Sequence, residues 1–301
     1  DALSHVLIRL PTVFQIGGAA SVNHAFSDAA KLALKARPYS SEVVTLAGHK
    51  SYVACVAAAP DGRVITGSFD KTVKVWLNGA CERTIQAHTD YARAVAVLPG
   101  GARFVSVSSD KTAKLWTFDG ALERTFEVGW NVLCVAALPD GVHFVIGTRR
   151  NEVRLYHVDG TLHTFEGHTK RVTALAVTRD GQHIISGSNN KLVKVWSVAT
   201  KSLVSTCIGH TNYVIAVAAM PDGQRILSGG RDETVRVWLL NGTLENTFEL
   251  HAGWVTAEVK ALVALPDNQH ALSASVDNTV KLFNVNDGAV LRTFPHPSAV
   301  F

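Results

Sequence analysis

The stretch GHKSYVACVAAAPDGRVITGSFDKTVKVW, residues 48–76, decides the fold because its pattern recurs along the chain. Within it, apolar and β-branched runs flank a Pro-Asp-Gly turn at residues 60–62, and an Asn-Gly turn follows at residues 78–79. Such runs between such turns predict short antiparallel strands. The closing aromatic recurs at intervals of 40 to 45 residues, as Trp76, Trp116, Tyr156, Trp196, Trp238 and Phe283. The sequence therefore predicts six repeat units, each of four strands.

The composition indicates a folded protein with a mild positive charge. Of the 301 residues, 47% are hydrophobic and 18% are charged, and 29 Lys and Arg against 25 Asp and Glu give a net charge of +4. Because no run of like charges stands out, we expect neither nucleic acid nor a membrane as partner. The first ten residues do not resemble a signal peptide, and no apolar stretch approaches the roughly 18 residues of a membrane span. We expect a cytoplasmic or nuclear location.

The sequence contains no motif that predicts catalysis. The four cysteines stand far apart without a C-x-x-C pair, so we expect reduced thiols, no metal site and no cofactor. His, Asp and Ser recur at the same places in successive units, without the G-x-S-x-G turn of a nucleophile elbow. Such recurrence is better explained by a structural role than by a catalytic triad, because repeat units must each be stabilised against their neighbours. We therefore expect no enzymatic activity.

A further mark recurs in step with the aromatic residues and the turns. A Gly-His pair or a near match opens most units, at Gly48-His49, Ala87-His88, Gly167-His168, Gly209-His210 and Leu250-His251. With these marks, residues 42–296 resemble the WD-repeat β-propeller family. The resemblance implies an all-β propeller of four-stranded antiparallel blades. Six blades are favoured and seven are possible, because seven candidate outer strands run from residues 43–46 to residues 290–294.

The resemblance also implies a buried hydrogen-bonded chain inside each blade. In the family, this chain joins a histidine, a Ser or Thr of the second strand, a turn Asp and the closing Trp. The first blade offers His49, either Thr66 or Ser68, Asp70 and Trp76. The matching structural residues of the other blades are His88, Asp110, Trp116, His168, Asn190, Trp196, His210, Asp232, Trp238, His251 and Asp277. A buried histidine needs a partner for each ring nitrogen, which such a chain supplies.

The third unit departs from this pattern. Val128 stands at the histidine position, Arg150 at the Asp position and Tyr156 at the Trp position. We therefore expect this blade to lack the internal chain and to have gained a role at the surface. The sixth unit is also unusual, because the loop that enters it is four residues longer than that of the first unit.

The first 40 residues differ from the rest, which divides the chain into residues 1–40 and a propeller at 41–301. Apolar residues at helical spacing precede Pro11, and a second such stretch spans residues 25–34. This segment resembles an F-box, a helical motif that docks on the Skp-family adaptor of cullin-type ubiquitin ligases. The resemblance assigns adaptor binding to Leu3, Val6, Leu7 and Leu10. The alternative is a helical cap on one face of the propeller.

The loops that carry the histidines and the turn Asp residues lie on one face in this family. On that face, the sequence predicts a peptide-binding site at Tyr52, Tyr91, Trp130, Arg149, Arg171, Tyr213, Arg231 and Trp254. If the sixth unit is aligned on Pro266 instead, Glu258 replaces Trp254. Tyr, Trp and Arg are common at binding hot spots, although the aromatics could pack between blades and the arginines could pair with nearby carboxylates.

These features predict a protein-interaction module that binds an acidic or phosphorylated peptide, because guanidinium groups bind carboxylates and phosphates at two points. With the F-box resemblance, the module would be the substrate-recognition subunit of a cullin-type ubiquitin ligase. The alternative function is a scaffold or peptide reader outside any ligase.

Overall fold

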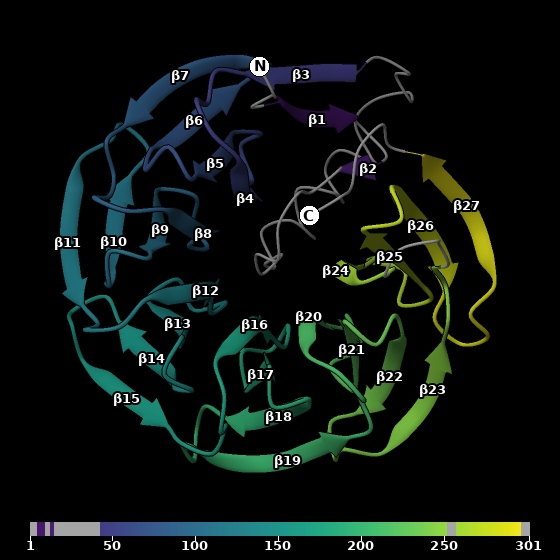
Figure 1. Cartoon of the computed structure of the whole chain (residues 1–301). Coiled ribbons are helices and arrows are strands. Elements are labelled where there is room, and N and C mark those ends of the chain that lie inside the picture. Colours follow the sequence, from purple (N-terminus) through teal and green to yellow (C-terminus); the bar gives the residue numbers. More distant parts are fainter. Residues whose placement is uncertain (1–4, 10–12, 15–42, 252–256, 296–301) are drawn as a thin grey trace.

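Six four-stranded antiparallel sheets are arranged as blades around one axis in the computed structural model (Figure 1). The structure describes residues 5–9, 13–14, 43–251 and 257–295. Every regular element in these ranges is a β-strand. The prediction of an all-β propeller with six four-stranded blades is therefore confirmed.

Each blade is formed by four consecutive strands, with the first strand innermost and the fourth outermost (Figure 1). The first blade contains β4 (Val53–Ala58), β5 (Val64–Ser68), β6 (Val73–Leu77) and β7 (Ala80–Ile85). The second contains β8 (Ala92–Val97), β9 (Arg103–Ser108), β10 (Thr112–Thr117) and β11 (Leu122–Glu127). The third contains β12 (Val132–Ala137), β13 (His143–Thr148), β14 (Val153–His157) and β15 (Leu162–Phe165).

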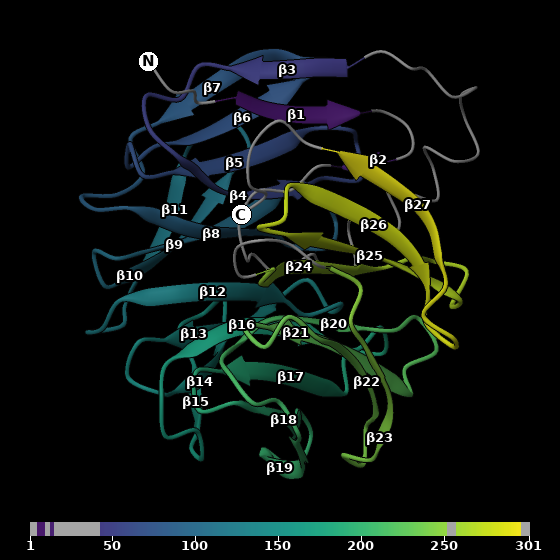
Figure 2. The same ribbon diagram turned by 45° about the vertical axis from the view of Figure 1, so that its right-hand side comes forward.

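The remaining blades continue the ring in the same order (Figure 2). The fourth blade contains β16 (Val172–Val177), β17 (His183–Ser188), β18 (Leu192–Ser197) and β19 (Ser202–Ile208). The fifth contains β20 (Val214–Ala219), β21 (Arg225–Gly230), β22 (Val235–Leu239) and β23 (Leu244–Phe248). The sixth contains β24 (Val259–Ala264), β25 (His270–Ser275), β26 (Thr279–Asn284) and β27 (Val290–Pro295).

The turn signals of the sequence form the hairpins between these strands. Between β6 and β7, Asn78 and Gly79 have φ values of 51° and 84°. Two successive positive φ values define the tight turn whose twist matches that of the flanking strands, and Asn and Gly tolerate them best. In five of the six blades, an Asn-Gly or Asp-Gly pair lies between the third strand and the outer strand.

The hydrophobic core lies between the faces of neighbouring blades. The inner strands are buried on both faces, and the core cluster that contains Ile65 of β5 also contains Val95 of β8 and Val135 of β12. The outer strands are largely exposed, as in β7, where Ile85 alone is buried. A continuous core between repeats stabilises each blade through its neighbours.

The predicted N-terminal helix is wrong over the part of it that the structure describes. His5–Arg9 form strand β1, which pairs with β2 (Val13–Phe14) and with β3 (Val43–Ala47). Figure 1 shows this three-stranded sheet between the first and sixth blades. The β-branched residues of β1 favour an extended backbone, and pairing with β3 satisfies its polar groups, which outweighs the helical spacing of the apolar residues. The surplus outer strand, β3, thus joins a separate sheet.

Two of the four residues assigned to adaptor binding, Val6 and Leu7, lie in β1, where they pair with Leu46 and Thr45 of β3. The other two, Leu3 and Leu10, lie outside the described residues, as does the second stretch of helical spacing.

Candidate functional site

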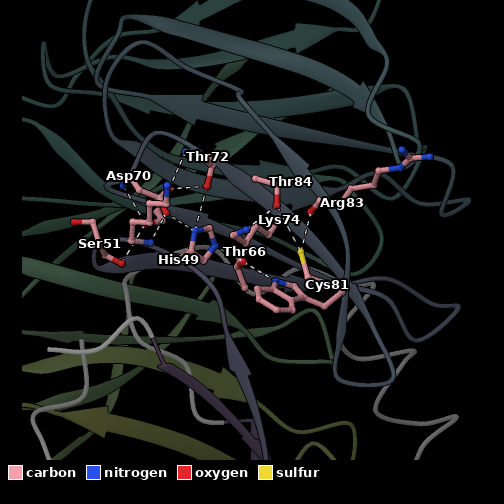
Figure 3. Close-up of polar contacts among 12 residues, drawn as sticks. His49, Ser51, Thr66, Asp70, Thr72, Lys74, Cys81, Arg83 and Thr84 are labelled. Carbon is pink, nitrogen blue, oxygen red and sulfur yellow. Dashed lines mark hydrogen bonds and ion pairs between the residues drawn. The ribbon is translucent and has the colours of Figure 1, made fainter. Parts of the chain in front are cut away.

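A chain of three hydrogen bonds crosses the first blade (Figure 3). The indole N–H of Trp76 donates to Oγ1 of Thr66 at 2.8 Å, and Thr66 Oγ1 lies 2.7 Å from Nε2 of the buried His49. Nδ1 of His49 lies 2.8 Å from the carboxylate of Asp70. The Thr66 hydroxyl can then donate to Nε2 while Nδ1–H donates to Asp70, so both ring nitrogens are satisfied. We call this arrangement the blade lock.

The first blade lock uses Thr66 rather than Ser68, the alternative that the sequence left open. Ser68 has a different role, because its hydroxyl donates to the Ser51 carbonyl and accepts the Asp70 N–H at 3.0 Å. It thereby stabilises the turn that presents the Asp70 carboxylate to His49.

Four other blades contain the same arrangement. Nδ1 of His88, His168, His210 and His251 lies 2.8, 3.3, 2.7 and 2.8 Å from the side chains of Asp110, Asn190, Asp232 and Asp277, respectively. Their Nε2 atoms contact the hydroxyls of Ser106, Ser186, Ser228 and Ser273 at 2.6 to 2.8 Å. Trp116, Trp196 and Trp238 complete three of these locks by donating to the serine. In the sixth blade, Phe283 has no N–H to donate.

Burial lowers the pKa of His49, His168 and His251, and the lock contacts lower the pKa of the turn Asp residues. Burial acts to raise the pKa of Asp70, but hydrogen bonds from Thr72, the Lys50 N–H and His49 outweigh it and lower the pKa to about 2. Burial lowers the pKa of His168 to about 4, and its bond to Asn190 opposes that shift only in part. A neutral histidine between fixed partners is suited to holding a blade together and has no free nitrogen for proton transfer.

The third blade replaces the lock by aromatic packing. Val128 and Ile146 are buried at the histidine and serine positions, so both polar partners are lost together. Tyr156 stacks on Phe144 with ring centroids 5.4 Å apart, and Phe126 packs edge-on against both rings. The expected absence of the internal chain in this blade agrees with these contacts, and an apolar residue at position 146 was the further signal in the sequence.

A basic residue two positions before each closing aromatic is a structural feature that sequence reasoning missed. These residues are Lys74, Lys114, Arg154, Lys194, Arg236 and Lys281. In four blades the cation lies 5.8 to 6.0 Å from the centroid of the tryptophan ring of its own blade. The runs VKVW, AKLW and VRVW show this basic residue directly in the sequence. At this distance the cation can make a cation–π contact with the ring that the lock orients.

The histidine loops and turn Asp residues share one face, which we call the top face. There, the residue just before each innermost strand accepts a backbone hydrogen bond from the residue just after the second strand of the same blade. The six pairs are Tyr52 with Phe69, Tyr91 with Ser109, Asn131 with Arg149, Arg171 with Asn189, Tyr213 with Arg231 and Glu258 with Val276. The top-face ring is defined by these twelve residues. In the sixth blade the position belongs to Glu258, whereas Trp254 lies outside the described residues.

Over the first and second blades the top-face ring is aromatic. Tyr52 is 69% exposed, and its ring contacts Phe69 edge-on, with centroids 6.2 Å apart. Phe69 in turn stacks on Tyr91 at 4.4 Å. The guanidinium of Arg93 lies over both of these rings, 4.8 Å from the Phe69 centroid and 5.2 Å from that of Tyr91. Tyr52 and Tyr91, both predicted for the peptide-binding site, therefore lie together with Phe69 and Arg93, which the prediction did not include.

Over the third to fifth blades the ring is rich in arginine. Arg149 and Arg171 are exposed, and the neighbouring Arg150 lies over the exposed Trp130 ring at 4.2 Å. In the fifth blade, Arg231 lies 5.5 Å from the Tyr213 centroid.

The carboxylate of Glu258 offsets the charge of Arg231. Its two oxygens lie 3.1 Å from Arg231 Nε and 2.6 Å from Lys260 Nζ. Such pairing is the competing interpretation that the sequence left open for the arginines, and the geometry supports it at this position.

The described residues include no group of three or more His, Cys, Asp or Glu side chains placed to hold a metal ion. In the same ranges no helix has the length and hydropathy needed to cross a membrane. All four cysteines are free thiols, and burial raises the pKa of Cys55 and of Cys207 to about 12.

The blades, the locks and the top-face ring together define a repeat β-propeller built to present loops on one face. The chain belongs to the family described as WD domain, G-beta repeat, whose model matches residues 40–76, 79–117, 160–197, 201–238 and 242–284. The matched segments omit residues 118–159, which include most of the blade without a lock. The protein is thus a WD-repeat protein-interaction module, and propellers of this kind typically act as non-catalytic scaffolds.

Among curated proteins, this chain is similar to parts of several WD-repeat proteins. It is 46% identical to phospholipase A-2-activating protein of Xenopus laevis over 55 residues, 18% of this chain and 7% of that protein. It is 40% identical to pre-mRNA-processing factor 19 homolog 2 of Arabidopsis thaliana over 78 residues, 24% of this chain and 15% of that protein. It is 36% identical to DDB1- and CUL4-associated factor 13 of Xenopus tropicalis over 76 residues, 24% of this chain and 16% of that protein. The matched part of the chain thus spans less than a fifth of the length of each of these three relatives.

Proposed function

We propose that the top face of this WD-repeat module binds an acidic or phosphorylated peptide. The observation that carries the proposal is that Arg149 and Arg171 lie on the third and fourth blades, next in the ring to the two blades that carry the stacked Phe69 and Tyr91. Guanidinium groups bind carboxylates and phosphates through two parallel hydrogen bonds. Flat aromatic surfaces contribute contact area at low cost in side-chain entropy.

Five carboxylates near this face already have partners other than Arg149 and Arg171. Those of Asp70, Asp110, Asp232 and Asp277 each contact a lock histidine. The carboxylate of Glu258 is paired with two cations. The guanidinium groups of Arg149 and Arg171 supply local positive charge for an incoming anion, which favours its capture.

The test is a set of labelled ten-residue peptides that differ only at the central position, which is Ser, Glu, phosphoserine or Lys. We expect the phosphoserine peptide to bind about tenfold more tightly than the Ser peptide, the Glu peptide to be intermediate and the Lys peptide to be weakest. A single-stranded oligonucleotide is the control for binding to any polyanion. Preference for the Lys peptide, or for the oligonucleotide over all four peptides, would contradict the proposal.

A role as the substrate receptor of a cullin-type ubiquitin ligase is a second candidate. Support comes from the relative that is named for association with DDB1 and CUL4, whereas strand β1 removes part of the helix expected of an F-box. Co-purification of the full chain with a Skp-family adaptor or with DDB1 would favour this role. Binding to neither would favour the non-ligase scaffold.

The cytoplasmic or nuclear location and the division at residue 40 stay predictions.

A further inference from the structure

Each innermost strand carries a β-bulge at its top-face end. In β8, Ala92 pairs with Ser108 and Ala94 pairs with Val107, which leaves Arg93 as the extra residue. The extra residues of the six innermost strands are Ala54, Arg93, Leu133, Thr173, Ile215 and Lys260. Bulges re-aim a side chain and are frequent beside functional sites. We call these six residues the bulge ring.

The bulge ring carries two cations, and they differ in how their charges are balanced. Lys260 Nζ lies 2.6 Å from the Glu258 carboxylate. Arg93 has no carboxylate within ion-pair distance among the described residues, where its single hydrogen bond runs from Nε to the Ser109 hydroxyl at 2.8 Å. The two Nη groups of Arg93, which carry four of its five N–H donors, therefore lack a protein acceptor in the part of the chain that is described.

The guanidinium plane of Arg93 is nevertheless held in place. Its Nε is fixed by the buried Ser109, and Phe69 and Tyr91 support its face. Tyr52 contacts Phe69 edge-on and is itself exposed, so the aromatic wall is continuous with the exposed surface. A guanidinium that is already oriented loses little further entropy when it binds an anion, unlike one on a free side chain.

The electrostatic surroundings of Arg93 agree with an anion site. Burial lowers the pKa of Arg93, the charges of Arg149 and Arg171 act in the same direction, and Asp90 opposes them. The positive charges of Arg149 and Arg171 thus act on the guanidinium of Arg93. An anion bound to Arg93 offsets that unfavourable effect, which makes its binding more favourable.

We propose that Arg93 is the specificity-determining residue of the top face, and that its two Nη groups bind the carboxylate or phosphate of the peptide. This inference rests on the proposed function and deepens it, because it assigns the anion to one residue of the bulge ring. Arg149 and Arg171 then contribute mainly long-range attraction, whereas Arg93 supplies the two-point contact. The aromatic wall of Tyr52, Phe69 and Tyr91 receives the residues next to the anion.

The test compares phosphoserine-peptide affinity among Arg93→Gln, Arg93→Lys and a control, Lys111→Gln, which removes one positive charge from an exposed turn of the same blade. We expect Arg93→Gln to weaken binding at least tenfold. Arg93→Lys keeps the positive charge but loses the two-point hydrogen-bonding geometry of the guanidinium, and we expect it to weaken binding about fivefold. Lys111→Gln should change binding less than twofold. Unfolding midpoints report whether each variant is folded, and Phe69→Leu gives a second measure if Arg93→Gln is not folded.

The outcomes separate this inference from the proposed function. If the wild-type protein prefers the phosphoserine peptide and neither Arg93 variant weakens it, the assignment to Arg93 is wrong and the proposed function stands. If the wild-type protein shows no preference for the anionic peptides, both are wrong. A selective loss in the Arg93 variants, together with a shift of the Arg93 Nε–H resonance on addition of O-phosphoserine, supports both.

Discussion

Replacing Asp232 with alanine is expected to lower the free energy of unfolding by about 3 kcal/mol. The side chain of Asp232 is 3% exposed, and it accepts hydrogen bonds from His210, the Thr211 N–H and Thr234. The substitution leaves the buried donors of His210 and Thr234 without an acceptor, which costs the desolvation of each of them. Denaturant unfolding at pH 7 measures the loss.

The pH dependence of the wild-type protein gives a second view of the same contact. Burial acts to raise the pKa of Asp232, but the His210 and Thr211 contacts outweigh it and lower the pKa to about 2. A carboxyl group with a depressed pKa stabilises the fold above its unfolded pKa of about 3.9. That contribution is lost as the pH falls from about 4 towards 2, and Asp232→Ala should lack this part of the acid sensitivity.

The matched control for this prediction is Arg150→Ala. Arg150 stands at the turn Asp position of the third blade, but it is exposed and lies over Trp130 instead of contacting a buried histidine. Its removal should cost less than about 1 kcal/mol. Equal losses for Asp232→Ala and Arg150→Ala would show that the lock does not stabilise the blades.

Introducing valine at Gly147 is expected to destabilise the propeller by about 3 kcal/mol. A Cβ atom at Gly147 would lie 2.5 Å from Cys134 Sγ and 2.7 Å from Cγ1 of Val172 on the next blade. These neighbours are themselves buried, so the strain cannot be relieved by moving a side chain into solvent. Denaturant unfolding again gives the measurement, and a loss below about 1 kcal/mol would contradict the packing described here.

The second blade supplies the compensating change for that variant. There, Val107 occupies the position of Gly147, and its cross-strand partner is Ala94 instead of the cysteine found opposite Gly147. Adding Cys134→Ala to Gly147→Val copies this pairing in the third blade. We expect the double variant to recover about 1 kcal/mol, because the clash with the sulfur is removed while that with Val172 persists.

The repeats made the propeller predictable from sequence. Pro-Asp-Gly and Asn-Gly turns mark the ends of strands. Because these turns recur in step with Trp76 and its counterparts, they predict four strands in each unit. The N-terminal segment does not repeat, so the spacing of its apolar residues could not be checked against a second copy. Apolar residues spaced as on a helix also suit a strand when a partner such as β3 is available, and the pairing in the folded chain decided between them.

Positions of the top-face ring could be predicted from the sequence by counting from each histidine, because equivalent loops place equivalent residues at the same point of each blade. Glu258 was ambiguous, since its loop is longer and the count depends on the anchor. Arg93 could not be found in this way. It lies inside a strand, and only the bulge in β8 together with the contacts to Phe69, Tyr91 and Ser109 shows that it belongs to this face.

The most direct test of anion recognition by the top face uses the double variant Arg149→Ala/Arg171→Ala. Its charge-matched control is Lys111→Ala/Lys191→Ala, which removes two exposed cations from turns of the second and fourth blades. The measured quantity is the dissociation constant of the phosphoserine peptide at fixed salt. We predict that the arginine variant binds at least tenfold more weakly than wild type and that the lysine variant changes less than threefold. Equal affinity of the arginine variant and wild type would contradict the account.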